Sequence, residues 1–338
     1  MRLPTGAKNP LTILANARRI MRLIRAEKVD IVHARSRAPA WSARIACRQA
    51  GIPFVTTFHG IYGEKNSAKR LYNSVMARGD AIIANSHYTA QIIKERYGAE
   101  AQRIIVIPRG VDSVRFDPTA VNDERRAALR REWGIHPGDK IVLQLARLAA
   151  WKGQRVLIEA AALPPLAGRS DIAFVLAGDD QGRIEYRRDL EERIRAAGLD
   201  GRVRLVGHCD DVPAALALAD LAVIASTEPE GFGRSAIEAA AMGVPVVAAS
   251  LGATPETVLA PPAMSAAERT GWLVPPNDAG VLASAIGGAL ALPAEERQAL
   301  AARARRHAEA FTAEAMQEAT LRIYERLVSQ RRDAKAGS

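Results

Sequence analysis

The sequence predicts an α/β protein made of two successive doubly wound domains, each with a parallel sheet between helices. Three observations support this prediction. Short apolar runs alternate with longer segments of helical periodicity along most of the chain, which is typical of βαβ units. This rhythm stops once, over residues 108–118, where Pro, Gly and Asp cluster as in a linker, and then restarts. The length of 338 residues suits two domains of ordinary size.

The first half is expected to alternate helices and strands up to the linker. Residues 11–28 form a helix with a basic outer face, and its apolar positions Leu14, Ala17, Met21 and Ile24 should face the sheet. Further helices are expected at residues 39–50, 68–78 and 88–97. Strands are expected at residues 30–33, 53–58, 81–84 and 104–107.

The second half repeats the pattern and then becomes helical. Strands are expected at residues 140–145, 173–177, 203–206, 221–225 and 244–248. Helices are expected after Lys152, at 212–219 and 235–242, and over most of the chain from residue 279. In doubly wound domains ligands bind beyond the carboxyl ends of the strands, so the functional residues should follow the strands directly.

Composition narrows the class of protein. With 48% apolar and 25% charged residues, the bulk of the chain has the composition of a folded domain rather than of a disordered segment. The two cysteines, Cys47 and Cys209, form neither a disulfide framework nor a metal-ligand spacing. The longest uncharged stretches, 239–255 and 279–294, are short and contain Gly or Pro, and the first residues lack an apolar leader. We therefore expect a soluble cytoplasmic protein.

The net charge of +10 is unevenly distributed. Residues 1–112 contain 19 basic and 7 acidic side chains, whereas the remainder contains 28 and 30. Such asymmetry predicts an anionic partner for the first half: a nucleic acid, an anionic membrane surface or a phosphorylated substrate. A nucleic acid is disfavoured because no basic-aromatic interleaving and no nucleic-acid-binding module is found.

Three groups of residues follow predicted strands. Arg147 and Lys152 lie five apart between a strand and a helix, where a guanidinium and an ammonium can meet one diphosphate. The run Glu230-Gly231-Phe232-Gly233 precedes a helix whose N–H groups point at the strand ends, and Glu238 follows in that helix. These carboxylates suit hydroxyl-rich ligands. Alternatively, Ser235 and Glu238 form a capping box, which would make Glu238 structural.

The third group ends with a histidine. His59 closes the run Thr56-Thr57-Phe58-His59-Gly60, where it could donate a hydrogen bond or a proton to a ligand, or serve a structural role. The runs Gly178-Asp179-Asp180 and Gly207-His208 also follow predicted strands, and they are weaker candidates for residues that line the same ligand-binding cleft.

Together these motifs, with the linker Ile107-Pro108-Arg109-Gly110-Val111-Asp112, resemble family 4 glycosyltransferases of the GT-B fold. The resemblance covers nearly the whole chain, and the Glu-x₇-Glu element enclosing Gly-Phe-Gly is its most specific part. Residues 9–12 and 33–42 resemble the branch that acts in lipopolysaccharide core assembly.

The resemblance implies two Rossmann-like domains that face each other across a cleft, and a retaining transfer of a hexose-type sugar from a nucleotide-diphosphate donor. Arg147 and Lys152 would bind the diphosphate, and His59 would contact the transferred sugar. The resemblance also implies which residues bind the other parts of the nucleotide-sugar donor. The sugar hydroxyls would be bound by Glu230, Gly231, Phe232 and Gly233. The ribose would be bound by Glu238, and the nucleobase would lie near Gly207 and His208. Neither a metal nor another cofactor is expected, since the Arg/Lys pair neutralises the phosphates and no Asp-x-Asp motif is present.

The acceptor is expected to be a lipopolysaccharide or a related glycolipid or oligosaccharide. Arg35, Arg37 and Tyr62 are placed on the acceptor side, and the basic first half should dock on the inner face of the cytoplasmic membrane without spanning it. The expected domains are an acceptor-side domain at 1–112, a nucleotide-sugar domain at 113–311, a helix returning to the first domain at 312–330 and a charged tail at 331–338.

Two features depart from the family pattern. Arg109 stands where the linker usually carries Asn, and its role is open. Family members also begin with a strand, a Gly-rich loop, a helix and another strand, and about 50–60 such residues are expected to be missing before this start. The alternatives are therefore a catalytically impaired truncated homologue, or another GT-B enzyme such as a nucleotide-sugar epimerase or a sucrose- or glycogen-type synthase.

Overall fold

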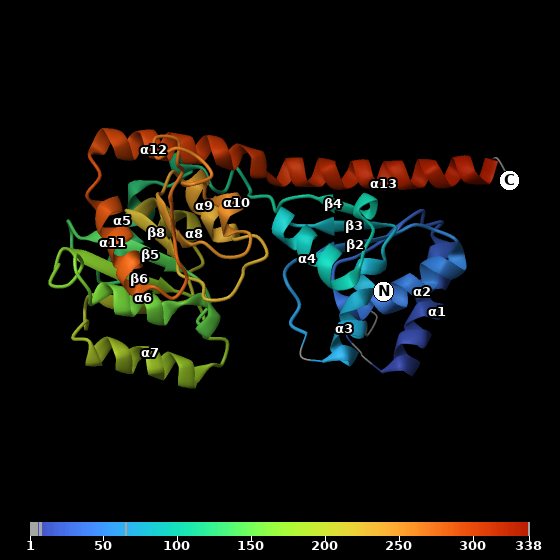
Figure 1. Ribbon diagram of the computed structural model, residues 1–338, viewed down its shortest axis with the longest axis horizontal. Coiled ribbons are helices and arrows are strands. Elements are labelled where there is room, and N and C mark those ends of the chain that lie inside the picture. Colours follow the sequence, from blue (N-terminus) through green and yellow to red (C-terminus); the bar gives the residue numbers. More distant parts are fainter. Residues whose placement is uncertain (1–5, 7–8, 65, 337–338) are drawn as a thin grey trace. The chain divides into compact units, whose positions relative to one another are not determined.

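The computed structural model describes residues 6, 9–64 and 66–336, which form two compact units. The first unit combines Met1–Arg109 with Glu314–Ser338, and the second comprises Gly110–Ala313 (Figure 1). Each has its own parallel sheet, which confirms the predicted pair of Rossmann-like α/β domains. The boundaries predicted after residues 112 and 311 stay predictions.

The first unit has a four-stranded parallel sheet in which the strands follow sequence order. Its strands are β1 (Val32–Ala34), β2 (Phe54–Phe58), β3 (Ala81–Ala84) and β4 (Ile104–Val106). Its helices are α1 (Pro10–Ala26), α2 (Arg37–Ala50), α3 (Ser67–Asn73) and α4 (His87–Tyr97), with the C-terminal helix α13 (Ala313–Ala336) and 3-10 turns at Ser74–Arg78 and Ala101–Arg103.

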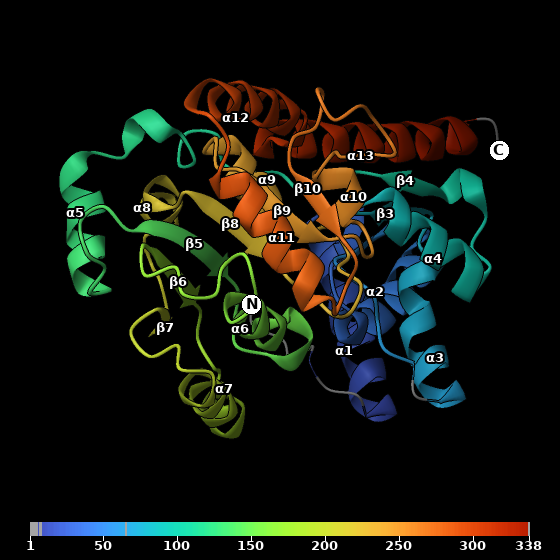
Figure 2. The ribbon, with the colours of Figure 1, turned by 60° about the vertical axis from the view of Figure 1, so that its left-hand side comes forward.

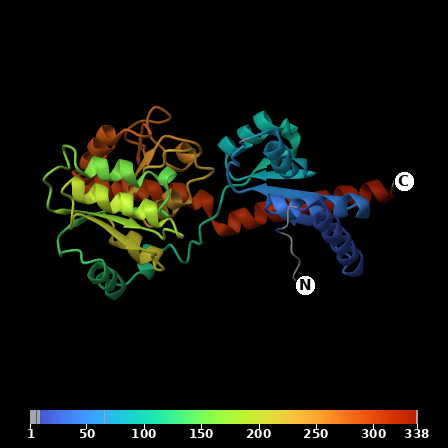
Figure 3. The same ribbon diagram turned by 90° about the horizontal axis from the view of Figure 1, so that it is seen from below.

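Side-chain alternation along these strands divides the first unit into layers. Phe54, Phe58 and Ile82 point to the face that packs against α2 and α4. Val55 and Ile83 point to the opposite face, together with apolar residues of α13. The C-terminal helix runs along this sheet (Figures 1 and 3), so a segment more than 200 residues later in the sequence completes the first unit.

Polar caps fix where the helices of the first unit begin. The Asn9 side chain accepts a hydrogen bond from the backbone N–H of Leu11 at 2.8 Å, directly before α1. Ser86 accepts in the same way from Thr89 N–H at 3.0 Å, directly before α4. Such caps satisfy N–H groups that the first helical turn leaves without intrahelical partners.

The second unit has a six-stranded parallel sheet of order β10-β9-β8-β5-β6-β7. Its strands are β5 (Lys140–Leu145), β6 (Ile172–Ala177), β7 (Val203–Gly207), β8 (Leu221–Ile224), β9 (Val246–Ala249) and β10 (Trp272–Val274). Its helices are α5 (Asp123–Glu132), α6 (Gln154–Ala161), α7 (Ile184–Ala196), α8 (Val212–Leu218), α9 (Arg234–Ala241), α10 (Thr254–Thr257), α11 (Ala279–Leu290) and α12 (Ala294–Ala308), with 3-10 turns at Pro118–Ala120, Ala150–Lys152 and Glu309–Phe311.

The strand order of the second unit reverses direction at β5. From β5 the chain builds outward through β6 and β7, and then returns to place β8 on the other side of β5 (Figure 2). The loops that leave β5 and β8 therefore diverge to opposite faces of the sheet. This is the topological switch point at which doubly wound sheets bind ligands.

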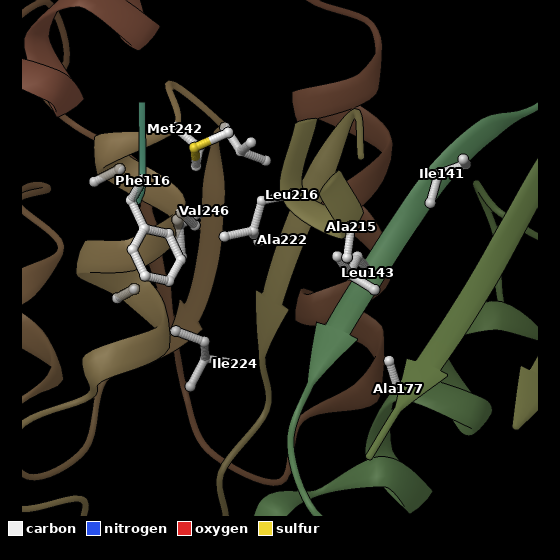
Figure 4. Close-up of a cluster of buried hydrophobic side chains, with 14 of the residues drawn as sticks. Phe116, Ile141, Leu143, Ala177, Ala215, Leu216, Ala222, Ile224, Met242 and Val246 are labelled. Atoms are coloured by element: carbon white, nitrogen blue, oxygen red, sulfur yellow. The ribbon is translucent and has the colours of Figure 1, made fainter. Parts of the chain in front are cut away.

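Two apolar layers hold the second unit together. One joins Ile141, Leu143 and Ile224 of the sheet to Leu216 of α8 and to α9 and α12 (Figure 4). The other joins Phe174 and neighbouring strand residues to α6, α7 and α11. Burial of both faces explains why these strands read as continuous apolar runs in the sequence.

The structure differs from the sequence-based elements in several places. The short edge strand β10 and the helix α5 were not expected, and the expected helix at 68–78 is an α-helix followed by a 3-10 turn. Leu14 was expected to face the sheet but is 47% exposed. The last helix was expected to end at residue 330, before a tail, but it continues to Ala336, while residues 337–338 lie outside the described part.

Within residues 6, 9–64 and 66–336, none of the helices combines the length and the apolar character that crossing a membrane requires.

Candidate active site

The loop that follows β5 is held against the end of β8. Gly153 adopts a positive φ of 73°, and a Cβ atom there would lie only 1.7 Å from the carbonyl oxygen of Ala225. The backbone N–H of Thr227 also donates to the carbonyl of Trp151 at 2.8 Å. Only glycine permits this close approach, so the sequence Trp151-Lys152-Gly153 brings Lys152 to the switch point of the sheet.

Lys152 and Glu230 form a nearly buried ion pair at this point. The Nζ atom of Lys152 lies 2.8 Å from Oε1 of Glu230, and the two side chains are 16% and 10% exposed. The hydroxyl of Ser226 donates to the same carboxylate oxygen. Both residues were predicted as site residues, but their direct contact was not.

The backbone of Glu230 is fixed from a second direction. Its carbonyl accepts a hydrogen bond from the N–H of Ala253 at 2.9 Å, and Glu230 pairs with Gly252 in an isolated parallel bridge. Gly252 has a positive φ of 66°, and a Cβ atom there would lie 2.5 Å from the Glu230 carbonyl oxygen. The loops after β5, β8 and β9 therefore position one carboxylate together.

The glycines around Phe232 set the start of α9. Phe232 itself is buried, and its ring centroid lies 5.8 Å from that of Phe311, so its side chain anchors the loop in the core. Gly233 has a φ of 80° and occupies the N-cap position of α9. Because glycine has no side chain, Gly231 and Gly233 present only backbone atoms at the N-terminal end of α9.

Glu238 does not form the capping box considered as an alternative. The helix begins at Arg234, after Gly233, so Ser235 lies inside the first turn and no side chain caps the helix. Glu238 instead accepts from Arg234 at 2.9 Å and is 12% exposed. Burial raises the pKa of its carboxyl group, while Arg234 and Arg115 oppose that shift.

The remaining residues that were predicted to bind the nucleotide-sugar donor lie nearer the surface. Arg147 is exposed in the loop after β5, with its guanidinium 5.7 Å from the ring centre of Trp151. Gly207 ends β7 with a positive φ of 77°. His208 follows it, and its exposed ring lies 3.1 Å from a carboxylate oxygen of Asp210. These residues share the carboxyl edge of the same sheet with Lys152 and Glu230.

In the first unit, His59 lies between two arginines. Arg109 Nη1 is 2.7 Å from His59 Nδ1, and Arg35 Nε is 3.3 Å from His59 Nε2. Burial and the two guanidinium groups lower the pKa of His59 to about 4, so the ring is neutral at pH 7. Arg109, whose role the sequence left open, therefore contacts the predicted site histidine directly.

His33 belongs to the same region, although no sequence signal singled it out as a site residue. Its Nδ1 lies 2.6 Å from the hydroxyl of Tyr324, and its Nε2 lies 2.6 Å from the hydroxyl of Thr57. Burial, followed by Arg35, lowers the pKa of His33 to about 4. The contact with Tyr324 spans 291 positions in the sequence, which explains why local pattern reading missed it.

The other two predicted acceptor-side residues contact each other. The guanidinium carbon of Arg37 lies 4.4 Å from the ring centre of Tyr62, and Arg37 Nη1 donates to the Asn73 side chain at 2.9 Å. The Tyr62 ring also packs on Phe58, at 5.2 Å between centroids. The structure thus brings Arg35 to His59, whereas Arg37 and Tyr62 form a separate cluster.

Comparison with known proteins decides the family. Residues 125–307 match the family described as Glycosyl transferases group 1, and residues 1–115 match Glycosyltransferase Family 4. The chain belongs to the group 1 glycosyl transferases. A relative from Jonesia denitrificans, named D-inositol 3-phosphate glycosyltransferase, is 30% identical over 317 residues, which cover 88% of this chain and 72% of the relative.

Solved structures give the same family and fold. A glycosyltransferase from Rickettsia africae superposes with a TM-score of 0.86 at 33% identity, over 95% of this chain and 83% of that one. Anabaena HepE in complex with UDP and glucose superposes with a TM-score of 0.78 at 27% identity, over 91% and 80% of the two chains. This glycosyl transferase chain therefore has the GT-B fold that the motifs predicted.

Across the described ranges of this glycosyl transferase, no group of three or more His, Cys, Asp or Glu side chains is arranged to hold a metal ion.

Proposed function

We propose that this chain transfers a hexose-type sugar from a nucleotide-diphosphate donor to an anionic acceptor, with retention of the anomeric configuration. The observation that carries the proposal is the Lys152–Glu230 pair at the switch point of the second sheet. An ammonium group and a carboxylate side by side suit a donor that presents a diphosphate next to sugar hydroxyls. The complex of the similar HepE with UDP and glucose supports a donor of this class.

The proposed roles in the second unit follow from charge and exposure. Lys152 and the exposed Arg147 would neutralise the diphosphate as the bond between the sugar C1 and the phosphate oxygen breaks. Glu230 would accept hydrogen bonds from the sugar hydroxyls, supported by the backbone of Gly231, Phe232 and Gly233. Glu238 would hold the ribose, and Gly207 and His208 would lie at the base. The proposed transfer requires no metal, because the basic side chains supply the positive charge.

His59 is proposed to act on the transferred sugar as a neutral hydrogen-bonding group. Its lowered pKa leaves the ring uncharged at pH 7, with the adjacent guanidinium groups supplying the local positive charge. A neutral imidazole can donate one hydrogen bond and accept another, so it can orient a hydroxyl group.

The acceptor is proposed to carry negative charge. The first unit holds most of the excess basic residues, and the Jonesia relative is named for a phosphorylated acceptor, D-inositol 3-phosphate. The lipopolysaccharide or glycolipid acceptor expected from the sequence stays a prediction. Such an acceptor would also carry negative charge.

Helix α1 supports a peripheral contact with an anionic membrane surface. Leu11, Leu14, Arg18, Arg22 and Arg25 are all exposed and three or four residues apart, so they lie along one side of the helix. Each basic residue close to an anionic surface contributes about 1 kcal/mol, and the two exposed leucines can enter the interface. We therefore propose that α1 rests on the inner face of the cytoplasmic membrane.

The donor proposal is tested by titrating the chain with UDP, GDP and ADP in a calorimeter, with and without EDTA. We expect one nucleotide to bind in both conditions. Incubation with the corresponding glucose nucleotide and a phosphorylated acceptor should then give a product whose anomeric coupling, measured by NMR, equals that of the donor. No nucleotide binding, binding lost in EDTA, an inverted product, or epimerised donor without transfer would each contradict the proposal.

A further inference from the structure

Two buried glutamines flank the loop that carries Arg147 and Lys152. Gln144 lies near the end of β5 and is 2% exposed, and Gln154 is the first residue of α6 and is fully buried. Gln144 shares its face of the sheet with Val142, which packs in the apolar layer with α6 and α11. An amide in such a layer is unfavourable unless it is hydrogen-bonded. The partners of these two side chains therefore indicate what they contribute.

Each glutamine donates to the backbone carbonyl of one of the two basic residues. Gln144 Nε2 lies 2.7 Å from the carbonyl oxygen of Lys152, and Gln154 Nε2 lies 3.1 Å from that of Arg147. A carbonyl oxygen can only accept, so these contacts fix which way round each side-chain amide lies. The loop is therefore tied crosswise: its first basic residue is bonded to the start of α6, and its second to β5.

The oxygen atoms of the two side-chain amides have different surroundings. Gln154 Oε1 accepts from the hydroxyl of Tyr186 at 3.0 Å, and burial raises the pKa of Tyr186 to about 12, so this hydroxyl keeps its proton at pH 7. Gln144 Oε1 is buried and has no hydrogen-bond partner, which costs free energy. A methionine of similar size would avoid that cost. What a glutamine adds at position 144 is therefore its bond to the Lys152 carbonyl.

The carbonyl oxygens between the two basic residues are also engaged. Those of residues 149, 150 and 151 accept, in that order, from the N–H groups of Lys152 at 2.8 Å, Gly153 at 3.2 Å and Thr227 at 2.8 Å. Carbonyl oxygens carry partial negative charge and would repel an anionic ligand. The two glutamines thus complete a set of bonds that keeps these atoms occupied within the protein.

We propose that Gln144 and Gln154 are positioning residues that hold the loop 147–152 in the conformation in which Arg147 and Lys152 bind the donor diphosphate. Neither glutamine touches the donor, because each acts through the backbone of one basic residue. This inference rests on the proposed function, and it adds to that function the residues that preorganise the two cations before the donor binds.

Gln144→Met tests the proposal because it keeps the side-chain volume and removes the bond to Lys152. It exchanges one unpartnered acceptor, the amide oxygen, for another, the Lys152 carbonyl, so the thermal midpoint of the free protein should change little. The affinity for the nucleoside diphosphate that the wild type prefers should fall at least fivefold in calorimetry. Val142→Ala, on the same face of β5, is the matched control. It leaves a cavity, so it should lower the thermal midpoint and leave the diphosphate affinity unchanged.

A double-mutant cycle tests whether each glutamine acts through its basic residue. In the Lys152→Ala background, Gln144→Met should lower the diphosphate affinity less than twofold. The same relation is expected for Gln154→Met in the Arg147→Ala background. Additive effects in either cycle would overturn the role of that glutamine, because a general loss of stability would weaken binding whether or not the basic side chain is present.

Hydrogen exchange in the free protein separates this inference from the donor function. Three N–H groups of the loop donate hydrogen bonds within the protein, those of Leu148, Lys152 and Gly153. Exchange in peptides covering residues 146–153 should be at least tenfold faster in Gln144→Met and Gln154→Met than in the wild type and in Val142→Ala. Unchanged exchange would overturn the proposal. A wild type that bound no nucleoside diphosphate, with faster exchange in the two glutamine variants, would contradict the donor function and support the restraint of the loop.

Discussion

Lys152 and Glu230 form a 2.8 Å ion pair although they are 78 positions apart in the sequence. They follow β5 and β8, and these strands are neighbours in the sheet. The ammonium group of Lys152 is therefore already paired with a carboxylate before any phosphate binds. A donor that enters this site must share the ammonium group with Glu230, and the pair orients both side chains in the absence of a ligand.

Removing the lysine should affect both binding and stability. Lys152→Ala deletes a charged partner of the diphosphate, which should weaken nucleoside-diphosphate binding by about 1.5–3 kcal/mol in calorimetry. It also leaves a nearly buried carboxylate without its cation, so the thermal midpoint should fall. Lys94→Ala, at an exposed position on α4, is the matched control and should change neither quantity. Unchanged nucleotide affinity in Lys152→Ala would refute the diphosphate role.

The two glutamates of the Glu-x₇-Glu element should respond differently to the same change. Glu230→Gln should mainly lower kcat, since this residue is assigned to the transferred sugar, whereas Glu238→Gln should mainly raise the donor KM. Steady-state kinetics with the preferred nucleotide sugar measures both effects. Arg234→Gln removes the partner of Glu238 without removing the carboxylate. If Glu238→Gln and Arg234→Gln lowered only the thermal midpoint, Glu238 would be structural rather than a ribose ligand.

Acid should destabilise the first unit through His33 and His59. Burial, followed by Arg35, lowers the pKa of His33 to about 4, and burial, followed by Arg109 and Arg35, lowers the pKa of His59 to about 4, below the ordinary value of 6.5. Between these values the unfolded chain binds more protons than the folded chain. The free energy of unfolding therefore decreases as the pH falls from 6.5 to 4 and is unaffected by these groups above that window.

The difference in thermal midpoint between pH 7.5 and pH 5 measures this effect. The difference should be smaller in the double variant His33→Gln, His59→Gln than in the wild type, even though the variant is less stable at both values. His208→Gln changes an exposed histidine and should retain the full wild-type difference. An identical difference in all three proteins would show that the two buried histidines do not contribute.

Membrane docking by α1 should depend on charge and on lipid composition. In flotation assays the chain should bind vesicles containing phosphatidylglycerol, bind less at physiological than at low salt, and ignore vesicles of phosphatidylcholine. Replacing Arg18, Arg22 and Arg25 with Gln should abolish binding. The matched control replaces Arg131 on α5 and Arg188 and Arg195 on α7, which are also exposed and lie in the second unit. Equal binding to both vesicle types, or to neither, would contradict the docking model.

The sequence alone determined the parallel α/β class and the order of most elements. Apolar runs alternating with helical segments are a local property, and burial on both faces makes the strands of such sheets easy to recognise. The same logic placed Arg147, Lys152, Glu230 and His59 at strand ends. The sequence pattern predicted the start of α9 one residue too late and left open a capping box between Ser235 and Glu238. The left-handed backbone of Gly233 sets the start of this helix, and no sequence pattern specifies that backbone conformation.

Only the tertiary structure decided which of these side chains meet. The Lys152–Glu230 pair depends on the pairing of β5 with β8, and the Arg35–His59–Arg109 cluster depends on β1, β2 and β4 ending at one edge. The contact of His33 with Tyr324 needs a helix from the far end of the chain. Hydrogen bonds and ion pairs form over about 3 Å, whereas sequence periodicity defines only which face of an element a residue occupies. These contacts therefore became visible only when the strands and helices of each unit were assembled.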